Sequence, residues 1–232
     1  MELNFAFLKE TFFLAIKGLP TALEITFFSL LIAVIPAFFM ALARLYKVKI
    51  ISPLVKVYVS FIRGTPMVLQ ILIIYSLMPS VINSFAKRIG SSFNVFNVNA
   101  IVYAVTVFSL HTMATLSEVI RSSITTVDKG QFDASRALGM KTLQTFRLVI
   151  LPQAAVEAIP NLGTLTLNLF KETSLCFIMT VKDITAIAKI QAAYGYNYIE
   201  AYIDIFLIYL LVCSAIQVLF YIIERIVKTY KR

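Results

Sequence analysis

The sequence predicts an all-α protein that crosses a membrane with five helices. The first observation behind this prediction is composition: of 232 residues, 59% are hydrophobic and only 14% are charged, with a mean hydropathy of +0.86. Soluble domains are about 45–50% apolar and about 25% charged. A soluble chain of this length could not bury so much apolar surface in one core. Lipid must therefore solvate part of the chain.

The second observation is the length of the apolar runs. A membrane-spanning helix needs roughly 20 mainly apolar residues. The fourth run contains Glu157, Lys171 and Glu172, but the apolar residues around these charges are continuous, so we count it as a span. In the second run, Gly64 and Pro66 predict a kink. The five predicted spans are residues 19–43, 55–78, 98–119, 152–181 and 203–223.

The remaining segments connect or flank these spans in a single membrane domain of residues 1–232. Residues 1–18 mix aromatic and charged side chains, which is typical of an interfacial amphipathic helix and not of a cleaved signal peptide. Residues 19–120 hold the first three spans, 121–151 form a polar loop, and 152–226 hold the last two spans. Residues 83–99 are predicted as a surface connection with one short helix.

The distribution of basic residues orients the chain. The formal net charge is +9, and most Lys and Arg residues lie in the loop after span one, in residues 121–151 and in the C-terminal tail. The positive-inside rule places these segments in the cytoplasm, so we expect the N-terminus outside and the C-terminus inside. The bases occur in short clusters between apolar runs, which suits a lipid bilayer and not a nucleic acid.

Residues 121–151 are predicted to form two short helices joined by a tight turn, and we call this segment the elbow. Asp128 and Gln131 have the spacing of a capping box before a short helix over 132–138. Gly139 suits the left-handed position that ends such a helix, and Thr142 can cap a second helix over 143–150. From these residues alone, two interpretations remain open: a rigid elbow that contacts another protein, or an amphipathic segment on the membrane surface.

The elbow resembles a motif of a known family. The run Asp133-Ala-Ser-Arg-Ala-Leu-Gly139, followed after nine residues by Val149-Ile-Leu-Pro152, resembles the EAA loop of ATP-binding-cassette importer permeases. It departs from the family pattern by Asp for Glu, Ser for the second Ala and Val for Ile. The runs 18–26, Phe61-Ile-Arg-Gly-Thr-Pro66 and Lys171-Glu-Thr-Ser-Leu175 resemble the polar amino-acid branch of that family.

The resemblance implies a MetI-like permease fold in a bacterial plasma (inner) membrane. It also implies that the elbow docks on a separate dimeric ATPase, through the contact and transmission residues Asp133, Ala134, Ser135, Arg136, Gly139, Leu151 and Pro152. The sequence contains no Gly-x4-Gly-Lys-Ser/Thr loop to hold nucleotide phosphates. ATP and Mg²⁺ are therefore expected on the ATPase partner, and no cofactor is expected in this chain.

A polar stripe on the fourth span is the candidate substrate path. Asn161, Asn168 and Glu172 follow one helical face, and charge inside a membrane is expensive enough to need a reason. One interpretation is a wall of the path, where Glu172 attracts an α-amino group or a basic side chain. The other is helix–helix packing, with Lys171 snorkelling. Gln70 in the second span is a lesser candidate for the path.

Other polar residues within spans are assigned structural roles. Arg63 is expected to anchor at the interface, with a gate or subunit contact as the alternative, and the lone His111 is expected to be a hydrogen-bonded packing residue. Cys176 and Cys213 lie in apolar runs and predict no disulfide framework. No residue pattern indicates a catalytic nucleophile with its base or a metal site, so an enzyme is not expected.

These observations favour a permease subunit of an ATP-driven importer for polar amino acids that works by alternating access. A second permease copy or a similar chain would complete the path, and an extracytoplasmic amino-acid-binding protein would deliver the substrate. Cystine, glutamine and the basic amino acids remain open. The alternative is a gradient-driven carrier, which should show an internal repeat that we do not find, or a non-transporting membrane scaffold subunit.

Overall fold

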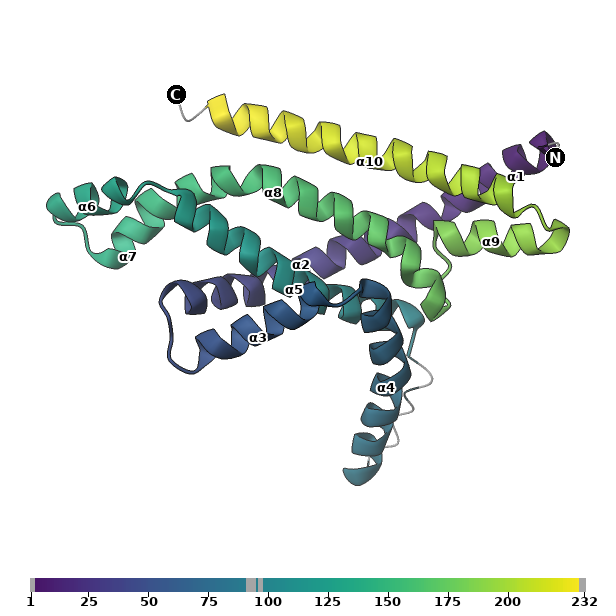
Figure 1. Ribbon diagram of the computed structural model, residues 1–232, viewed down its shortest axis with the longest axis horizontal. Coiled ribbons are helices and arrows are strands. Elements are labelled where there is room, and N and C mark those ends of the chain that lie inside the picture. Colours follow the sequence, from purple (N-terminus) through teal and green to yellow (C-terminus); the bar gives the residue numbers. More distant parts are fainter. Residues whose placement is uncertain (1–2, 91–94, 96–97, 230–232) are drawn as a thin grey trace.

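The computed structural model describes residues 3–90, 95 and 98–229, and these form helices with no strand among them. Figure 1 shows the long helices running roughly side by side, except for one that projects away. The helices are α1 (Phe5–Ala15), α2 (Leu19–Leu45), α3 (Ile51–Gly64), α4 (Met67–Arg88), α5 (Ala100–Thr126), α6 (Lys129–Ala137), α7 (Thr142–Thr145), α8 (Leu151–Glu172), α9 (Ile184–Gly195) and α10 (Tyr198–Thr229).

Five helical segments of the described chain are long and apolar enough to cross a membrane, which confirms the predicted number of spans. α1 and α2 together form the first of them, with a single 3₁₀ turn between the two helices. The five segments are Phe5–Leu45, Met67–Arg88, Ala100–Thr126, Thr142–Met179 and Tyr198–Lys228.

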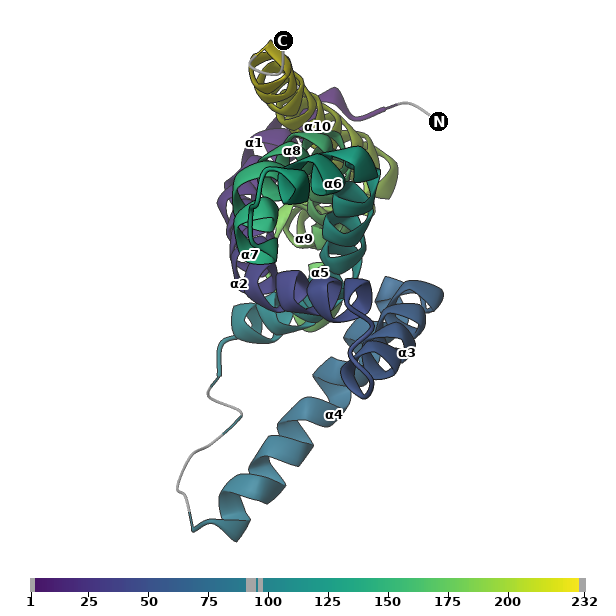
Figure 2. The same ribbon diagram turned by 90° about the vertical axis from the view of Figure 1, so that its left-hand side faces the viewer.

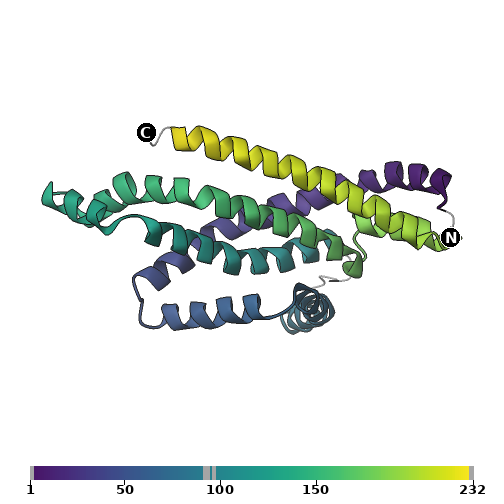
Figure 3. The ribbon, with the colours of Figure 1, turned by 45° about the horizontal axis from the view of Figure 1, so that its top comes forward.

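The prediction of one continuous second span over 55–78 is wrong. α3 ends at Gly64, Thr65 and Pro66 are extended, and α4 starts at Met67. A residue before proline is pushed out of the helical region, and proline has no N–H to continue the helix. Instead of a kink, the chain makes a corner, and α4 points away from the other helices (Figures 2 and 3).

α4 also continues through Arg88, into the stretch 83–99 that was predicted as a surface connection. Of that stretch, residues 91–94 and 96–97 lie outside the described residues.

The core is built on the pairing of α2 with α5. Ala33, Ala37 and Ala41 of α2 are fully buried, and their spacing of four residues puts them on one face. Small side chains let membrane helices approach closely. α8 packs on α5, and α10 lies along α8 (Figure 1). Near one end, Phe108 of α5 joins Ile25 of α2, Ile71 of α4 and Leu169 of α8 in one apolar cluster.

The sequence reading missed α9. The α-helical part of the fourth span ends at Glu172, a 3₁₀ segment covers Thr173–Met179, and α9 follows. The Asp183 side chain caps α9 by accepting a hydrogen bond from the N–H of Ala186 at 2.8 Å. Tyr196 takes a left-handed conformation (φ 56°) just after the helix. Asp183 at the N-cap position and Gly195 at the end of the helix are local signals that could have located α9.

Gly18 allows the start of α9 to pack against the first span. A Cβ atom at Gly18 would lie 2.4 Å from the backbone carbon of Asp183. Because backbone atoms obstruct this position, no side-chain rotation can relieve the contact.

We predict that Gly18→Ala lowers the free energy of unfolding by about 1–3 kcal/mol, the usual cost of overpacking. Gly64→Ala is the matched control, since its Cβ would have nothing within 4 Å. Thermal unfolding of the detergent-purified chain should show a lower midpoint for Gly18→Ala only. Equal midpoints for the two variants would contradict the close packing.

Burial of Asp183 predicts a pH dependence of stability. Burial raises the pKa of this carboxyl to about 6, from an ordinary value of 3.8. Between these two values the folded state binds more protons than the unfolded state, so stability should rise as the pH falls through this window. Two pKa units correspond to roughly 3 kcal/mol.

The variant Asp183→Asn, which keeps an acceptor for the α9 cap, should be more stable than the parent at pH 7, and this advantage should shrink toward pH 4. The difference between the two unfolding midpoints at each pH is the measurement. A difference that does not change with pH would contradict the prediction.

Candidate functional site

A cleft of about 320 Å³ lies between α5 and α8, with the end of α3 at its border. Most of its lining side chains are polar or charged, although its walls belong to predicted membrane spans. The lining residues are Arg63, His111, Thr112, Thr115, Glu118, Val119, Ser122, Asn161, Thr164, Leu165, Asn168, Leu169 and Glu172.

α8 supplies one wall of the cleft. Asn161, Thr164, Asn168 and Glu172 all line it, because positions i, i+3, i+7 and i+11 share a helical face. Lys171, the immediate neighbour of Glu172, is exposed and does not belong to the lining. The geometry therefore separates the two adjacent charges, with the carboxylate in the cleft and the ammonium outside it.

α5 supplies a matching polar stripe that the sequence reading did not recognise. His111, Thr115, Glu118 and Ser122 stand at positions i, i+4, i+7 and i+11 and line the cleft opposite α8. The same helical periodicity that singled out the α8 stripe would have found this one.

His111 connects three helices. Its Nε2 lies 3.9 Å from Oε2 of Glu172 on α8, and its Nδ1 lies 3.2 Å from Oε1 of Gln70 on α4. The expectation of a hydrogen bond at His111 agrees with this geometry, but the side chain also lines the cleft, which the sequence reading did not anticipate.

Gln70 is buried, with 5% of its surface exposed, and is not part of the cleft lining. Its Nε2 donates hydrogen bonds to the carbonyl oxygens of Ile62 at 2.8 Å and Thr65 at 3.0 Å. In a continuous helix, the Ile62 carbonyl would accept from the N–H of residue 66, which proline lacks. The Gln70 side chain thus supplies the missing donor and holds the corner between α3 and α4.

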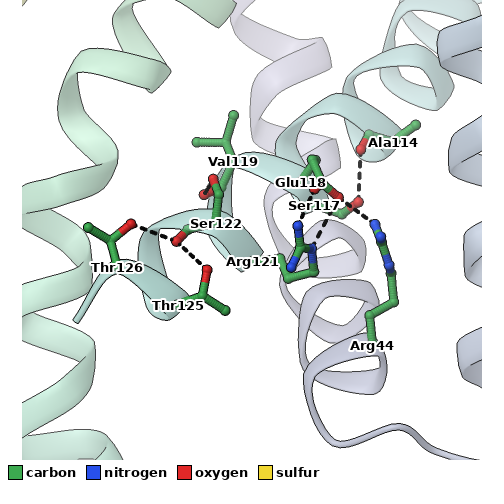
Figure 4. A network of polar contacts seen from close by, with 9 residues as sticks. All are labelled: Arg44, Ala114, Ser117, Glu118, Val119, Arg121, Ser122, Thr125 and Thr126. Atoms are coloured by element: carbon green, nitrogen blue, oxygen red, sulfur yellow. Dashed lines mark hydrogen bonds and ion pairs between the residues drawn. The ribbon is translucent and has the colours of Figure 1, made fainter. Parts of the chain in front are cut away.

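Glu118 is neutralised by two guanidinium groups (Figure 4). Arg44 of α2 contacts it at 2.5 Å, and Arg121 of α5 forms a second ion pair with it. Arg63 lines the cleft as well, and no described carboxylate lies within ion-pair distance of it. Of the two carboxylates in the cleft, Glu172 is therefore the one without a guanidinium partner.

The elbow begins at α6. The Asp128 side chain caps this helix by accepting from the N–H of Gly130 at 2.6 Å. The predicted return bond from Gln131 to Asp128 is absent from the described contacts, because the Gln131 side chain instead meets that of Gln153 on α8 at 3.3 Å. Gly139 adopts the predicted left-handed conformation, with φ 80°.

The second half of the elbow differs from the predicted helix over 143–150. The N-cap is Lys141 and not Thr142. A single α-helical turn, α7, leads into a π-helix over Phe146–Ile150, and α8 follows. Because Pro152 has no N–H for the carbonyl of Leu148, four residues earlier, regular α-helical bonding cannot continue across this junction. A π-helical stretch at such a place is often functional.

The predicted contact and transmission residues of the elbow differ in exposure. Asp133, Ala134, Arg136, Gly139 and Pro152 are exposed. Ser135 is buried, and its Oγ donates to the carbonyl oxygen of Gln131 at 2.6 Å, while Leu151 is half-buried.

The described residues contain no cluster of three His, Cys, Asp or Glu side chains that could hold a metal ion. A bundle of membrane-length helices around a polar cleft, with an exposed elbow at one end, has the architecture of a membrane transport subunit.

The family of this subunit follows from sequence comparison. Residues 33–229 match the family model of the binding-protein-dependent transport system inner membrane component, and the chain belongs to this family. These proteins are permease subunits of ATP-binding-cassette importers and not enzymes, since ATP hydrolysis belongs to a partner ATPase.

Two named relatives are similar over most of the chain. The L-cystine transport system permease protein TcyL of Bacillus subtilis is 33% identical over 210 residues, which cover 90% of this chain and 85% of that protein. The octopine transport system permease protein OccM of Rhizobium radiobacter is 31% identical over 227 residues, covering 97% and 90% respectively.

Two solved structures are similar in fold to this chain. The crystal structure of an amino acid ABC transporter with histidines is similar at a TM-score of 0.82 and 31% identity, covering 97% of this chain and 99% of that one. The MetNI methionine ABC transporter, in inward-facing conformations, has a TM-score of 0.70 at 18% identity, over 93% and 96% of the two chains, and supports the fold alone. The expected MetI-like permease fold is confirmed.

Proposed function

We propose that this chain lines the translocation path of an ATP-driven amino-acid importer of the bacterial plasma membrane. The observation that carries the proposal is the pair of facing polar stripes on α5 and α8, with Glu172 unneutralised between them. A polar stripe on a membrane helix faces water, substrate or a partner helix. Here two stripes enclose a cleft, which favours the path over simple helix packing.

The charges of the cleft suit an amino acid. Glu172 and Arg63 carry opposite charges and line the same cleft, and a zwitterion carries one group complementary to each. The named relatives and the structural neighbour support this substrate class. Cystine, glutamine and the basic amino acids all fit such a lining.

A second permease completes the path. Asn161, Thr164 and Asn168 are exposed in the single chain, and lipid would solvate these side chains poorly. We propose that a second copy, or a similar permease related by a two-fold axis, covers the open side of the cleft. The projecting α4, which exposes Ile73, Leu77 and Val81, offers an apolar face for the same assembly.

The orientation follows the positive-inside rule: the N-terminus is outside and the C-terminus is in the cytoplasm. The elbow then meets a cytoplasmic ATPase dimer, which holds ATP and Mg²⁺, and a binding protein delivers substrate from the outside. Closure of the ATPases moves α6, and the π-helix before Pro152 transmits this motion into α8, where Asn161, Asn168 and Glu172 stand. Alternating access results.

We predict that Glu172→Gln lowers uptake about tenfold in liposomes that contain the complete importer, because a charge-assisted hydrogen bond to the substrate is lost. Lys171→Gln is the matched control, since Lys171 is adjacent but outside the cleft, and it should transport normally. Uptake of L-arginine, L-glutamine and L-cystine with and without ATP is the measurement.

The same assay tests the proposed function as a whole. Uptake by this chain without any ATPase would refute the proposed function in favour of a gradient-driven carrier. No uptake with the complete importer would favour a scaffold.

The elbow proposal predicts a contrast between two neighbours on α6. Ala134 is exposed, so Ala134→Arg should obstruct docking and abolish co-purification of the ATPase. Ser135 is buried and bonded within its own helix, so Ser135→Ala should retain the ATPase. The unfolding midpoints of Ala134→Arg and Ser135→Ala, measured beside that of the parent chain, serve as the control for folding. If Ala134→Arg captured the ATPase as well as the parent chain does, the docking face would lie elsewhere.

A further inference from the structure

The orientation of the Gln70 amide determines which nitrogen of His111 carries a proton. On its Nε2 side, Gln70 faces three oxygens: the carbonyls of Ile62 and Thr65, and Oγ1 of Thr65 at 2.9 Å. An inverted amide would put its own oxygen against two carbonyl oxygens, which repel it. The amide oxygen must therefore point to Nδ1 of His111.

An amide oxygen only accepts hydrogen bonds, so Nδ1 of His111 must be the donor in its 3.2 Å contact with Gln70. In the neutral imidazole, Nε2 then keeps its lone pair. This second nitrogen faces Oε2 of Glu172 across 3.9 Å. A protonated Nε2 would donate to that carboxylate at about 2.7–2.9 Å. At 3.9 Å neither atom donates a hydrogen bond to the other, and both remain available to a ligand.

Two acceptors about 4 Å apart form a binding site for a donor with several N–H groups. An ammonium nitrogen located between them can approach both at about 2.9 Å. The second acceptor, Glu172, adds the negative charge that balances the ligand. Both side chains line the same cleft, so a ligand in the cleft reaches the two acceptors together.

We propose that His111 is a specificity-determining residue of the substrate path, where its Nε2 and the Glu172 carboxylate jointly bind the α-ammonium group of the substrate. Gln70 is the positioning residue that holds His111 in the accepting tautomer. This inference rests on the proposed function and adds to it which end of the amino acid enters the space between α5 and α8. An acceptor pair of this kind rejects a ligand whose α-nitrogen is acylated and uncharged.

The test uses the complex of this permease with its ATPase in lipid nanodiscs, without the binding protein. Calorimetric titration with L-arginine, L-glutamine and L-cystine, each paired with its Nα-acetylated form, gives a ratio of dissociation constants for each pair. The variants are His111→Phe, which keeps a ring and removes both nitrogens, and Gln70→Met, which keeps His111 and removes its partner. Thr106→Val is the control on the same helix, at a half-buried position outside the cleft.

The parent complex should prefer the free amine at least tenfold. In His111→Phe, affinity for the free amine should fall about tenfold while affinity for the acetylated form stays nearly constant, so the ratio falls toward one. Gln70→Met should lower the ratio less, and Thr106→Val should leave it unchanged. A merely structural role of His111 would lower the unfolding midpoint and leave the ratio intact.

Three results would overturn the inference: an unchanged ratio in a folded His111→Phe complex, equal binding of Nα-acetyl-L-arginine and L-arginine by the parent, or no binding of any of the three amino acids by the parent. The second result would assign the site to the side-chain guanidinium instead. If ATP-driven uptake by the complete importer persists while any of these results holds, the inference fails and the proposed function stands.

Discussion

The side-chain amide of Gln70 bonds the carbonyl of Ile62, whose α-helical partner would have been the missing N–H of Pro66. In a membrane, an unbonded backbone carbonyl costs several kcal/mol, so a break in a helix is tolerated only where a side chain or a neighbour supplies the donor. This one replacement allows the chain to turn between α3 and α4, places Arg63 at the rim of the cleft, and directs the amide oxygen toward His111.

The same constraint acts at a second proline, at the junction between the elbow and α8. At Pro152, the chain meets the lost hydrogen bond with a π-helix over Phe146–Ile150 and not with a side-chain amide. The two solutions have different mechanical consequences. The Gln70 side chain closes the corner and also contacts His111 of α5, whereas the wider π-helical turn leaves a joint between the elbow and α8. A joint at this position is consistent with the proposed transmission of motion from a docked ATPase to α8, the helix that carries Glu172.

The cleft shows how the chain separates charges that are close in sequence and joins charges that are far apart. Lys171 and Glu172 are neighbours, yet only Glu172 enters the cleft. Arg44 and Arg121 come from different helices, and together they neutralise Glu118 (Figure 4). As a result, the cleft keeps Glu172 as a carboxylate available to a ligand, with the accepting nitrogen of His111 beside it. In the proposed assembly, a second permease covers the open side of the cleft and excludes lipid.

Local signals in the sequence determined the all-helical class, the number of spans, the cap at Asp128, the left-handed Gly139 and the polar face of α8, because length, capping and periodicity act within a few turns of one helix. Only the tertiary structure decided that 55–78 is two helices at a corner, since the direction of α4 depends on the packing of Ile71 in one cluster with Phe108 of α5 and Leu169 of α8. The tertiary structure also decided that the α5 face with His111 lines the cleft opposite α8. The helical spacing of His111, Thr115, Glu118 and Ser122 can be recognised in the sequence. The spacing alone does not predict which helix packs against this face. That pairing depends on contacts between α5 and α8, about fifty residues apart, and such contacts leave no local pattern in the chain.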